Sequence, residues 1–231
     1  MLSSEGLGGR IEREFKLRIP SGAALAELRA RLGGPVAHPV LQVNHFFDTE
    51  GRALGGARIA LRLRSETAPS TGTTFVLALK GPLLAEASSL AARPEAELAL
   101  TESAARGLLS GARSPIELLR TSSLSESALV RRACALAGGE PVRRLGAFEN
   151  ERTRVGPLRF PPGSPGPPLV FELDRTRFPD ASLEHELEVE LPADARPAEV
   201  ERALSDLLSS LGIRPEPSES KAARFFRTLD G

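Results

Sequence analysis

Residues 11–18 read Ile-Glu-Arg-Glu-Phe-Lys-Leu-Arg, and polar and apolar side chains alternate along them. A period of two is typical of a β-strand with one buried face. The polar face carries Glu12, Glu14, Lys16 and Arg18, and the apolar face carries Ile11, Phe15 and Leu17. We therefore expect a strand on which two carboxylates stand beside a lysine.

Other segments alternate in the same way, and most carry one sign of charge on the polar face. The acidic faces contain Glu95 and Glu97, then Glu172 and Asp174, then Glu186, Glu188 and Glu190. The cationic faces contain Arg58, Arg62 and Arg64, then Lys80, then Arg152 and Arg154 beside Asn150. One such strand alone is well explained by a solvent-facing sheet. Like charges on one face repel, however, so a set of acidic faces indicates compensation by cations or a metal.

Helical periodicity appears in three places. Leucines recur from Ser21 until Gly33-Gly34, two or three helices are expected over 101–137, and a further helix follows Pro197 to about Leu211. Residues 48–51 have the composition of a turn, and segments 65–74 and 156–168 have that of loops.

These elements predict an α+β fold dominated by antiparallel β-structure. Closing the strands with their charged faces inward gives a β-barrel whose solvated tunnel has acids on one side and bases on the other. Carboxylates suit Mg²⁺ or Mn²⁺, whereas Arg and Lys hold phosphate oxygens. We expect a single domain over 11–231, with a helical insertion around 101–137 and a disordered tail over 1–10.

The total charge argues against several classes of partner. Thirty basic and thirty acidic residues cancel, so nothing indicates binding to nucleic acid or to an anionic membrane. No apolar run approaches the length of a membrane span, and Cys134 is the only cysteine. We expect a cytoplasmic protein that is a monomer or a weak homodimer and whose partner is a small molecule.

A series of motifs resembles the CYTH superfamily, the triphosphate tunnel metalloenzymes. Glu12-x-Glu14-x-Lys16 matches the family's opening signature, which alone is a weak pattern. The further matches, in chain order, are Phe46-Phe47-Asp48-Thr49, Leu61-Arg62-Leu63-Arg64, Leu79-Lys80-Gly81, Phe148 to Arg152, Phe171-Glu172-Leu173-Asp174, Glu186-x-Glu188-x-Glu190 and Ser220-Lys221. The Asn150-x-Arg152 strand and the closing Ser220-Lys221 make the chain most similar to plant-type and related bacterial inorganic triphosphatases.

The resemblance implies a closed eight-stranded barrel with flanking helices, which binds a linear triphosphate and one or two Mg²⁺ or Mn²⁺ ions. The implied metal ligands are Glu12, Glu14, Glu188 and Glu190, with Glu172 and Asp174 as ligands or neighbours. The implied phosphate-binding residues are Lys16, Arg62, Arg64, Lys80, Arg152 and Lys221. The residues expected to act in catalysis are Glu12, Glu14, Lys80, Glu188 and Glu190, with Glu95 and Glu97 bordering the tunnel. Arg143, Arg144 and Arg154 are either tunnel residues or surface charges.

The expected activity is metal-dependent hydrolysis of the terminal phosphate, with inorganic tripolyphosphate as substrate. Two alternatives stay open. The substrate is an organic triphosphate, as in thiamine triphosphatases and class IV adenylate cyclases, or the protein is a polyphosphate or nucleotide sensor without turnover. The absence of Trp and Tyr favours a substrate without a ring, since rings gain from aromatic stacking.

Overall fold

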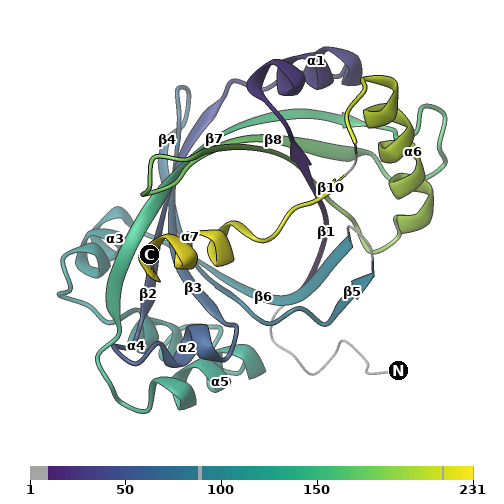
Figure 1. Ribbon diagram of the computed structural model, residues 1–231. Helices are drawn as coiled ribbons and strands as arrows, with labels where there is room; N and C mark the ends of the chain where they lie inside the picture. Colours follow the sequence, from purple (N-terminus) through teal and green to yellow (C-terminus); the bar gives the residue numbers. More distant parts are fainter. Residues whose placement is uncertain (1–9, 88–89, 215, 231) are drawn as a thin grey trace. The chain divides into compact units, whose positions relative to one another are not determined.

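The computed structural model describes residues 10–87, 90–214 and 216–230 (Figure 1). The strands are β1 (Arg10–Ile19), β2 (Val40–Asp48), β3 (Ala60–Ala68), β4 (Gly72–Lys80), β5 (Ala85–Ala87), β6 (Leu90–Leu100), β7 (Arg143–Leu158), β8 (Leu169–Arg177), β9 (Leu183–Glu190) and β10 (Glu216–Pro217). The helices are α1 (Gly22–Leu32), α2 (Ala53–Gly56), α3 (Glu102–Leu109), α4 (Pro115–Arg120), α5 (Ala128–Ala137), α6 (Pro197–Ser210) and α7 (Lys221–Asp230). The predicted tail falls mostly on residues 1–9, outside the described residues, and Arg10 already belongs to β1.

The strands form one sheet in the order β10-β1-β9-β8-β7-β2-β3-β4-β6-β5. An additional pairing between β1 and β6 closes eight of these strands into a ring. The pairs whose register is described, such as β1 with β9 and β3 with β4, are antiparallel. The predicted closed eight-stranded antiparallel barrel with flanking helices is therefore confirmed.

Two loop predictions are wrong in extent. Segment 65–74 was expected to be a loop, but β3 continues to Ala68 and β4 begins at Gly72, with the Thr67 and Thr73 hydroxyls 2.9 Å apart. Threonine suits a strand because it is β-branched, even where its polarity resembles that of a loop. Segment 156–168 is likewise shorter than predicted, since β7 extends to Leu158. The short elements α2 and β5 were not predicted.

The chain divides into two compact units. The first comprises the described parts of Met1–Ile11, Gln42–Leu84 and Arg93–Phe148, and the second comprises the described parts of Glu12–Leu41, Ala85–Ala92 and Glu149–Gly231. Each unit has its own hydrophobic core.

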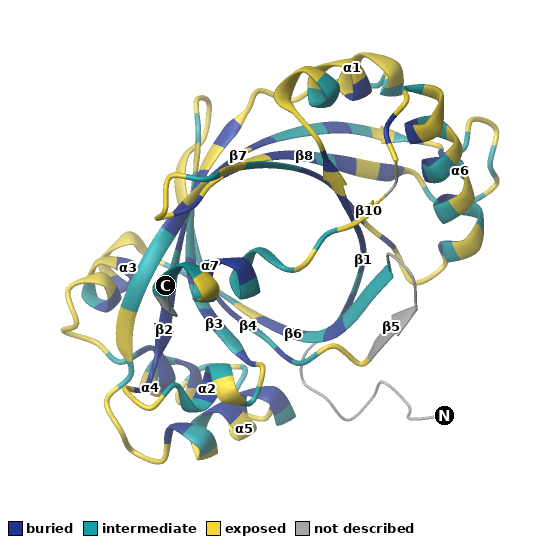
Figure 2. Ribbon diagram, viewed as in Figure 1, coloured by how far each residue is buried: buried dark blue, intermediate teal, exposed yellow. Residues whose placement is uncertain are grey.

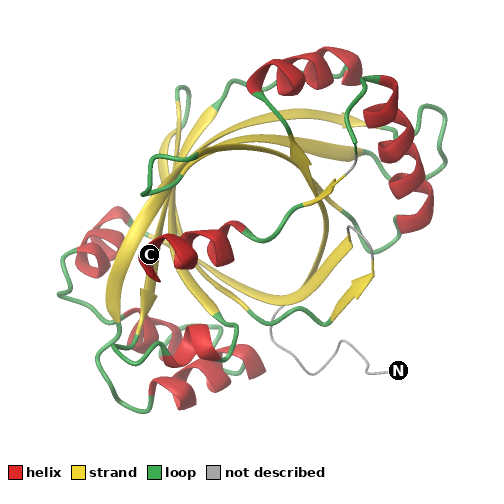
Figure 3. Ribbon diagram, in the orientation of Figure 1, coloured by secondary structure: helices red, strands yellow, loops and turns green. Residues whose placement is uncertain are grey.

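In the first unit, the apolar faces of β3 and β4 are buried under helices. Leu61 opposes Leu79 and Leu63 opposes Leu77, and all four side chains are fully buried. Helices α3, α4 and α5 add further buried residues to the same core, with α5 packed against both α2 and α4 (Figure 3). Because alternate residues point to opposite faces, this burial directs the charged side chains of β3 and β4 to the other face.

The second unit repeats this arrangement with β1, β8 and β9. Phe15, Phe171 and Val189 lie in one cross-strand row and are buried. Helix α6 contributes Val200, Leu204 and Leu208 to this core. The alternation is visible along the strands in Figure 2, where buried and less buried residues follow one another. The charged faces of these strands are again opposite the core.

Local signals account for the helix ends. Ser21 caps α1 by accepting a hydrogen bond from the Ala24 amide at 3.2 Å, and Gly33 ends that helix in the left-handed conformation at φ +67°. Pro197 stands in the first turn of α6, where its missing N–H costs nothing. Among the helices of the described residues, none is both long enough and apolar enough to cross a membrane.

Candidate functional site

Four strands of the second unit bring their charged faces together in regular rows. Lys16 on β1 opposes Glu188 on β9, which opposes Glu172 on β8, which opposes Arg154 on β7. The next row runs from Arg18 through Glu186 and Asp174 to Arg152. The predicted acidic and basic faces of these strands therefore share one surface.

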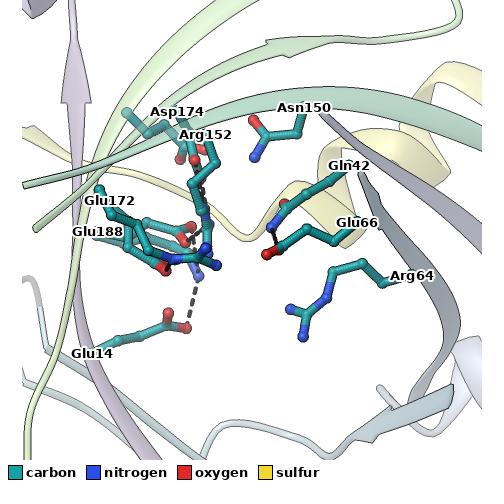
Figure 4. A network of polar contacts seen from close by, with 12 residues as sticks. Glu14, Gln42, Arg64, Glu66, Asn150, Arg152, Glu172, Asp174 and Glu188 are labelled. Carbon is teal, nitrogen blue, oxygen red and sulfur yellow. Dashed lines mark hydrogen bonds and ion pairs between the residues drawn. The ribbon is translucent and has the colours of Figure 1, made fainter. Parts of the chain in front are cut away.

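Arg152 is the centre of this surface. Its guanidinium donates to Asp174 Oδ1 at 2.7 Å and Oδ2 at 2.6 Å, to Glu188 Oε2 at 2.5 Å and also to Glu172. Figure 4 shows the guanidinium among these three carboxylates. A planar fork with several donors suits these contacts, because it holds both oxygens of Asp174 at once while reaching two further carboxylates.

Two lysines complete the cluster. Lys16 Nζ lies 2.7 Å from Glu14 Oε1 and 3.2 Å from Glu188 Oε1. Lys221 Nζ, on the first residue of α7, lies 2.7 Å from carboxylate oxygens of Asp174, Glu186 and Glu188. Glu188 therefore contacts both lysines as well as Arg152. We call this set, Glu14, Lys16, Arg152, Glu172, Asp174, Glu186, Glu188 and Lys221, the carboxylate cluster.

The cations keep the buried carboxylates ionised. Burial alone would raise the pKa of Glu188, but Lys16, Lys221 and Arg152 outweigh it and hold that pKa well below its usual range. The pKa of Asp174 is lowered in the same way, against its burial, by Arg152 and Lys221. Conversely, burial alone would lower the pKa of Lys221, but Asp174, Glu186 and Glu188 outweigh it and raise that pKa. Charged oxygen donors of this kind are what hard divalent cations take as ligands.

The first unit carries a second polar group on β3, β4 and β6. Lys80 lies opposite Glu95 in register, and its Nζ is 3.1 Å from Glu95 Oε1. Arg10 donates to the other oxygen of Glu95 at 2.8 Å, and Arg64 lies 3.5 Å from Glu97. Burial alone would raise the pKa of Glu95. The positive charge of Lys80, followed by those of Arg10 and Arg62, outweighs burial and lowers that pKa. We call Arg62, Arg64, Lys80, Glu95 and Glu97 the cationic group, because its lysine and arginines outnumber its acids.

The remaining predicted residues differ in exposure. Glu12 is buried, at 6% exposure, whereas Glu190 is exposed and opposes Glu14 in register. Arg154 lies on the charged face of the second unit, where its Nε donates to Glu172 at 3.0 Å. Arg143 and Arg144 are exposed, and Arg144 donates to His45 Nδ1 at 3.1 Å, so this pair carries surface charge.

Several polar residues near these groups were not predicted. Arg224, one turn after Lys221 on α7, binds Glu184 and lies 2.7 Å from Glu186. Gln42 on β2 donates to Glu66 on β3 at 2.7 Å (Figure 4). Asn44, two residues further along β2, is 1% exposed, and its Oδ1 accepts no hydrogen bond from any described residue. Buried polar atoms without a partner are rare, so this amide oxygen calls for an explanation such as a bound water or ion.

The lysine content of the sequence is a further signal for part of this site. The chain has 30 Lys and Arg residues, and its only three lysines are Lys16, Lys80 and Lys221. All three lie in the carboxylate cluster or the cationic group. In a chain that otherwise uses arginine for positive charge, each lysine marks a place where a compact ammonium group is needed.

The described residues contain no three His, Cys, Asp or Glu side chains already arranged around one metal position. The donor chemistry nevertheless fits a divalent cation, since the only donor atoms that the acids of the carboxylate cluster offer are oxygens, with no soft sulfur or imidazole ligand among them. Each of these carboxylates is held by a lysine or an arginine instead.

Two comparisons with known proteins found matches. The CYTH domain family matches residues 10–226. The structure of an adenylyl cyclase candidate from Hippeastrum, which reveals a dominant triphosphatase activity, is 28% identical, covers 94% of this chain and 96% of its own, and has a TM-score of 0.75.

Two further solved structures share the fold alone. A candidate adenylate cyclase from Bacillus halodurans is 22% identical, covers 95% of this chain and 100% of its own, and has a TM-score of 0.62. A protein from Pyrococcus horikoshii OT3 is 17% identical, covers 93% of this chain and 99% of its own, and has a TM-score of 0.60. A search of curated protein sequences found no match.

Proposed function

This chain belongs to the CYTH family, and from that premise we propose that it is a divalent-metal-dependent hydrolase that removes the terminal phosphate of a linear triphosphate, most readily inorganic tripolyphosphate. The observation that carries the proposal is the carboxylate cluster. A set of buried acids held ionised by lysine and arginine is costly to assemble, and it is useful for binding metal and phosphate.

In this proposal the carboxylates hold the metal. CYTH proteins are generally dependent on divalent metals. Glu14, Glu188 and Asp174 supply oxygen donors, with Glu12, Glu172 and Glu190 on the same strands. A bound Mg²⁺ or Mn²⁺ ion supplies positive charge that stabilises the phosphate oxygens as negative charge builds on them.

The lysines and arginines hold the phosphate chain. Arg64 and Lys80 retain side-chain exposures of 22% and 16%, so the protein does not fully cover either side chain. Arg62 lies on the same face of β3 as Arg64, two residues earlier. Arg forks bind phosphate oxygens bidentately, and the Lys80 ammonium acts as a point charge.

The reaction balances with water as the only co-reactant. The water oxygen forms a bond to the terminal phosphorus, and the bond from that phosphorus to the bridging oxygen breaks. For tripolyphosphate the products are orthophosphate and pyrophosphate, and the proton of the water passes to solvent or to a product. The residues contribute positioning and charge stabilisation, which are the main terms in phosphoryl transfer.

An organic triphosphate is the second candidate. The Hippeastrum relative favours it, because that protein is described both as an adenylyl cyclase candidate and as having a dominant triphosphatase activity. Thiamine triphosphate and ATP are therefore the comparison substrates. A sensor without turnover is the third candidate, and it gains least from the acids, because carboxylates repel an anion unless a metal binds between them.

The test is phosphate release from tripolyphosphate, thiamine triphosphate and ATP, with Mg²⁺ or Mn²⁺ and with a chelator. We expect phosphate release that depends on the metal and is fastest with tripolyphosphate. We also expect that no cyclic AMP forms from ATP. Folded protein that releases no phosphate from any of the three substrates would contradict the hydrolase proposal, and tight binding without release would support a sensor.

Matched variants assign the reaction to the carboxylate cluster and the cationic group. Glu188→Gln and Lys80→Ala should each abolish turnover while the protein stays folded by circular dichroism. Glu149→Gln is the control, because Glu149 is exposed on the opposite face of β7 from Arg152. Near-normal rates in both site variants would show that the reaction takes place elsewhere.

A further inference from the structure

A cavity of about 430 Å³ lies within the second unit, on the face of β7, β8 and β9 that is opposite the carboxylate cluster. Its sheet side is formed by alternate residues, including Glu151, Arg175 and His185, which oppose one another in register. These positions alternate with Arg152, Asp174 and Glu186 of the carboxylate cluster. The cavity is therefore separate from the proposed reaction site.

Helix α1 leaves this space open where two small residues, Gly22 and Ala26, stand one turn apart on the same face. Gly22, Ala26 and Arg29 line the cavity at helical spacing, together with Leu25. The neighbouring face of α1 is different, since Leu28 is fully buried in the core. At Gly22 a Cβ atom would lie only 3.3 Å from His185 Nε2, so a side chain there would crowd the cavity wall.

The charged residues of the cavity have no partners in the described structure. Arg29 and Arg175 form no hydrogen bond or ion pair with any described residue, in contrast to Arg152 of the carboxylate cluster. Both are exposed, so their guanidinium groups are accessible. Burial, and then Arg175, lowers the pKa of His185, so that its ring is neutral at pH 7 and offers one donor and one acceptor.

The cavity is also apolar in part. Leu173 is buried at its floor, and Leu183 is 40% exposed although it is a large hydrophobic residue. The volume falls within the range of small-molecule sites, in which apolar walls surround a few directed polar groups. An inorganic ion would leave the leucines exposed, and a neutral hydrocarbon would leave two guanidinium groups unused.

We propose that this cavity binds a small organic anion, whose single phosphate or carboxylate group is held by Arg29 and Arg175 and whose apolar body covers Leu183 and Leu173. Glu151 and the neutral His185 ring accept hydrogen bonds from hydroxyl or amino groups on that body. Guanidinium forks recognise both kinds of oxyanion, so phosphate and carboxylate are two sources of the same chemistry.

The probe is phenyl phosphate, with benzoate as the carboxylate arm, and binding is measured by titration calorimetry without metal. Inorganic phosphate lacks the apolar body, and benzyl alcohol lacks the charge. We expect phenyl phosphate or benzoate to bind at least about tenfold more tightly than either fragment, since two contributions are combined in one ligand. Binding of inorganic phosphate that equals that of phenyl phosphate would overturn the proposal.

Two pairs of variants locate the binding. The double variant Arg29→Ala, Arg175→Ala should lose binding by at least about tenfold, whereas Lys80→Ala should retain it. Ala26→Phe fills the cavity and should also abolish binding, whereas Ala23→Phe, on an exposed α1 position outside the lining, should not. Binding lost in Lys80→Ala but kept in the double arginine variant would assign the probe to the reaction site and refute this cavity. Melting temperatures show whether each variant remains folded.

Discussion

At the scale of single residues, the three lysines are the positions where chemistry is most specific. Lys16 is only 7% exposed, and its Nζ contacts both Glu14 and Glu188. At this buried position the larger, planar guanidinium would not fit the space that the compact ammonium fills between Glu14 and Glu188.

We therefore predict that Lys16→Arg lowers kcat/KM for the triphosphate by at least about tenfold although the charge is kept. Steady-state phosphate release measures this. The control is Arg18→Lys, the reverse exchange on the same strand face at an exposed position, which should change kcat/KM little. Equal rates for Lys16→Arg and wild type would show that only the charge at this position matters.

His45 gives a pH prediction at the same scale. Burial, and then Arg144, lowers the pKa of His45 from 6.5 to about 4. The unfolded chain therefore binds a proton at higher pH than the folded chain, so stability falls as pH drops from 6.5 to 4 and is constant above 6.5 for this group. Because the ring is only partly buried, solvent screening limits the loss to about 1–2 kcal/mol.

Urea unfolding of wild type and His45→Gln at pH 7.5, 5.5 and 4.5 tests this dependence. Glutamine keeps an acceptor for Arg144 but does not titrate, so the variant should be less sensitive to pH in this window. Carboxylates with lowered pKa values, such as Asp174 and Glu188, lose their contribution only as pH falls through about 4.5 and below. Identical pH profiles for the two proteins would contradict the assignment to His45.

At the scale of elements, the turn between β2 and α2 depends on one carboxylate. Asp48 is 1% exposed and accepts hydrogen bonds from the amides of Thr49 at 2.8 Å, Leu54 at 2.9 Å and Gly55 at 2.8 Å. It satisfies amides that β2 and the four-residue helix α2 cannot pair themselves.

We predict that Asp48→Ala lowers the free energy of unfolding by roughly 2–4 kcal/mol, because buried amides lose a charged acceptor. Asp48→Asn, which keeps one oxygen acceptor, should lie between Asp48→Ala and wild type in chemical denaturation. Glu50→Ala, at an exposed position of the same turn, should be neutral within about 0.5 kcal/mol. A neutral Asp48→Ala would show that the turn is held by its backbone alone.

The elements also show which features were predictable from the sequence. The faces of β1, β8 and β9 were predicted correctly, because alternation is a local property that burial then enforces. Arg224 was not predicted, because its contact with Glu186 depends on how α7 docks, and no local pattern encodes that docking. The hairpin between β3 and β4 was read as a loop, because threonine and serine are polar in loops and equally acceptable in exposed strands.

At the scale of the whole molecule, metal binding should couple to stability if the carboxylates are the ligands. A ligand that binds only the folded state at 100 times its dissociation constant adds about 2.7 kcal/mol. For a domain of this size, that corresponds to a rise in melting temperature of roughly 5–10 °C.

We predict this rise for wild type with Mg²⁺ or Mn²⁺ and its reversal by a chelator, measured by differential scanning calorimetry. Glu188→Gln should reduce the rise strongly, and Glu149→Gln should not. A rise that is unchanged in Glu188→Gln would place the metal away from the carboxylate cluster.

Because β8 contributes one face to the carboxylate cluster and the other to the cavity, its length is constrained during evolution. Glu172 and Asp174 point to the carboxylate cluster, while Leu173 and Arg175 point to the cavity under α1. Inserting or deleting one residue in this strand would exchange the two sets and damage both surfaces at once. Natural length variation within β8 should therefore occur in steps of two residues, or be confined to the connections at its ends, whereas substitutions on one face can accumulate without disturbing the other.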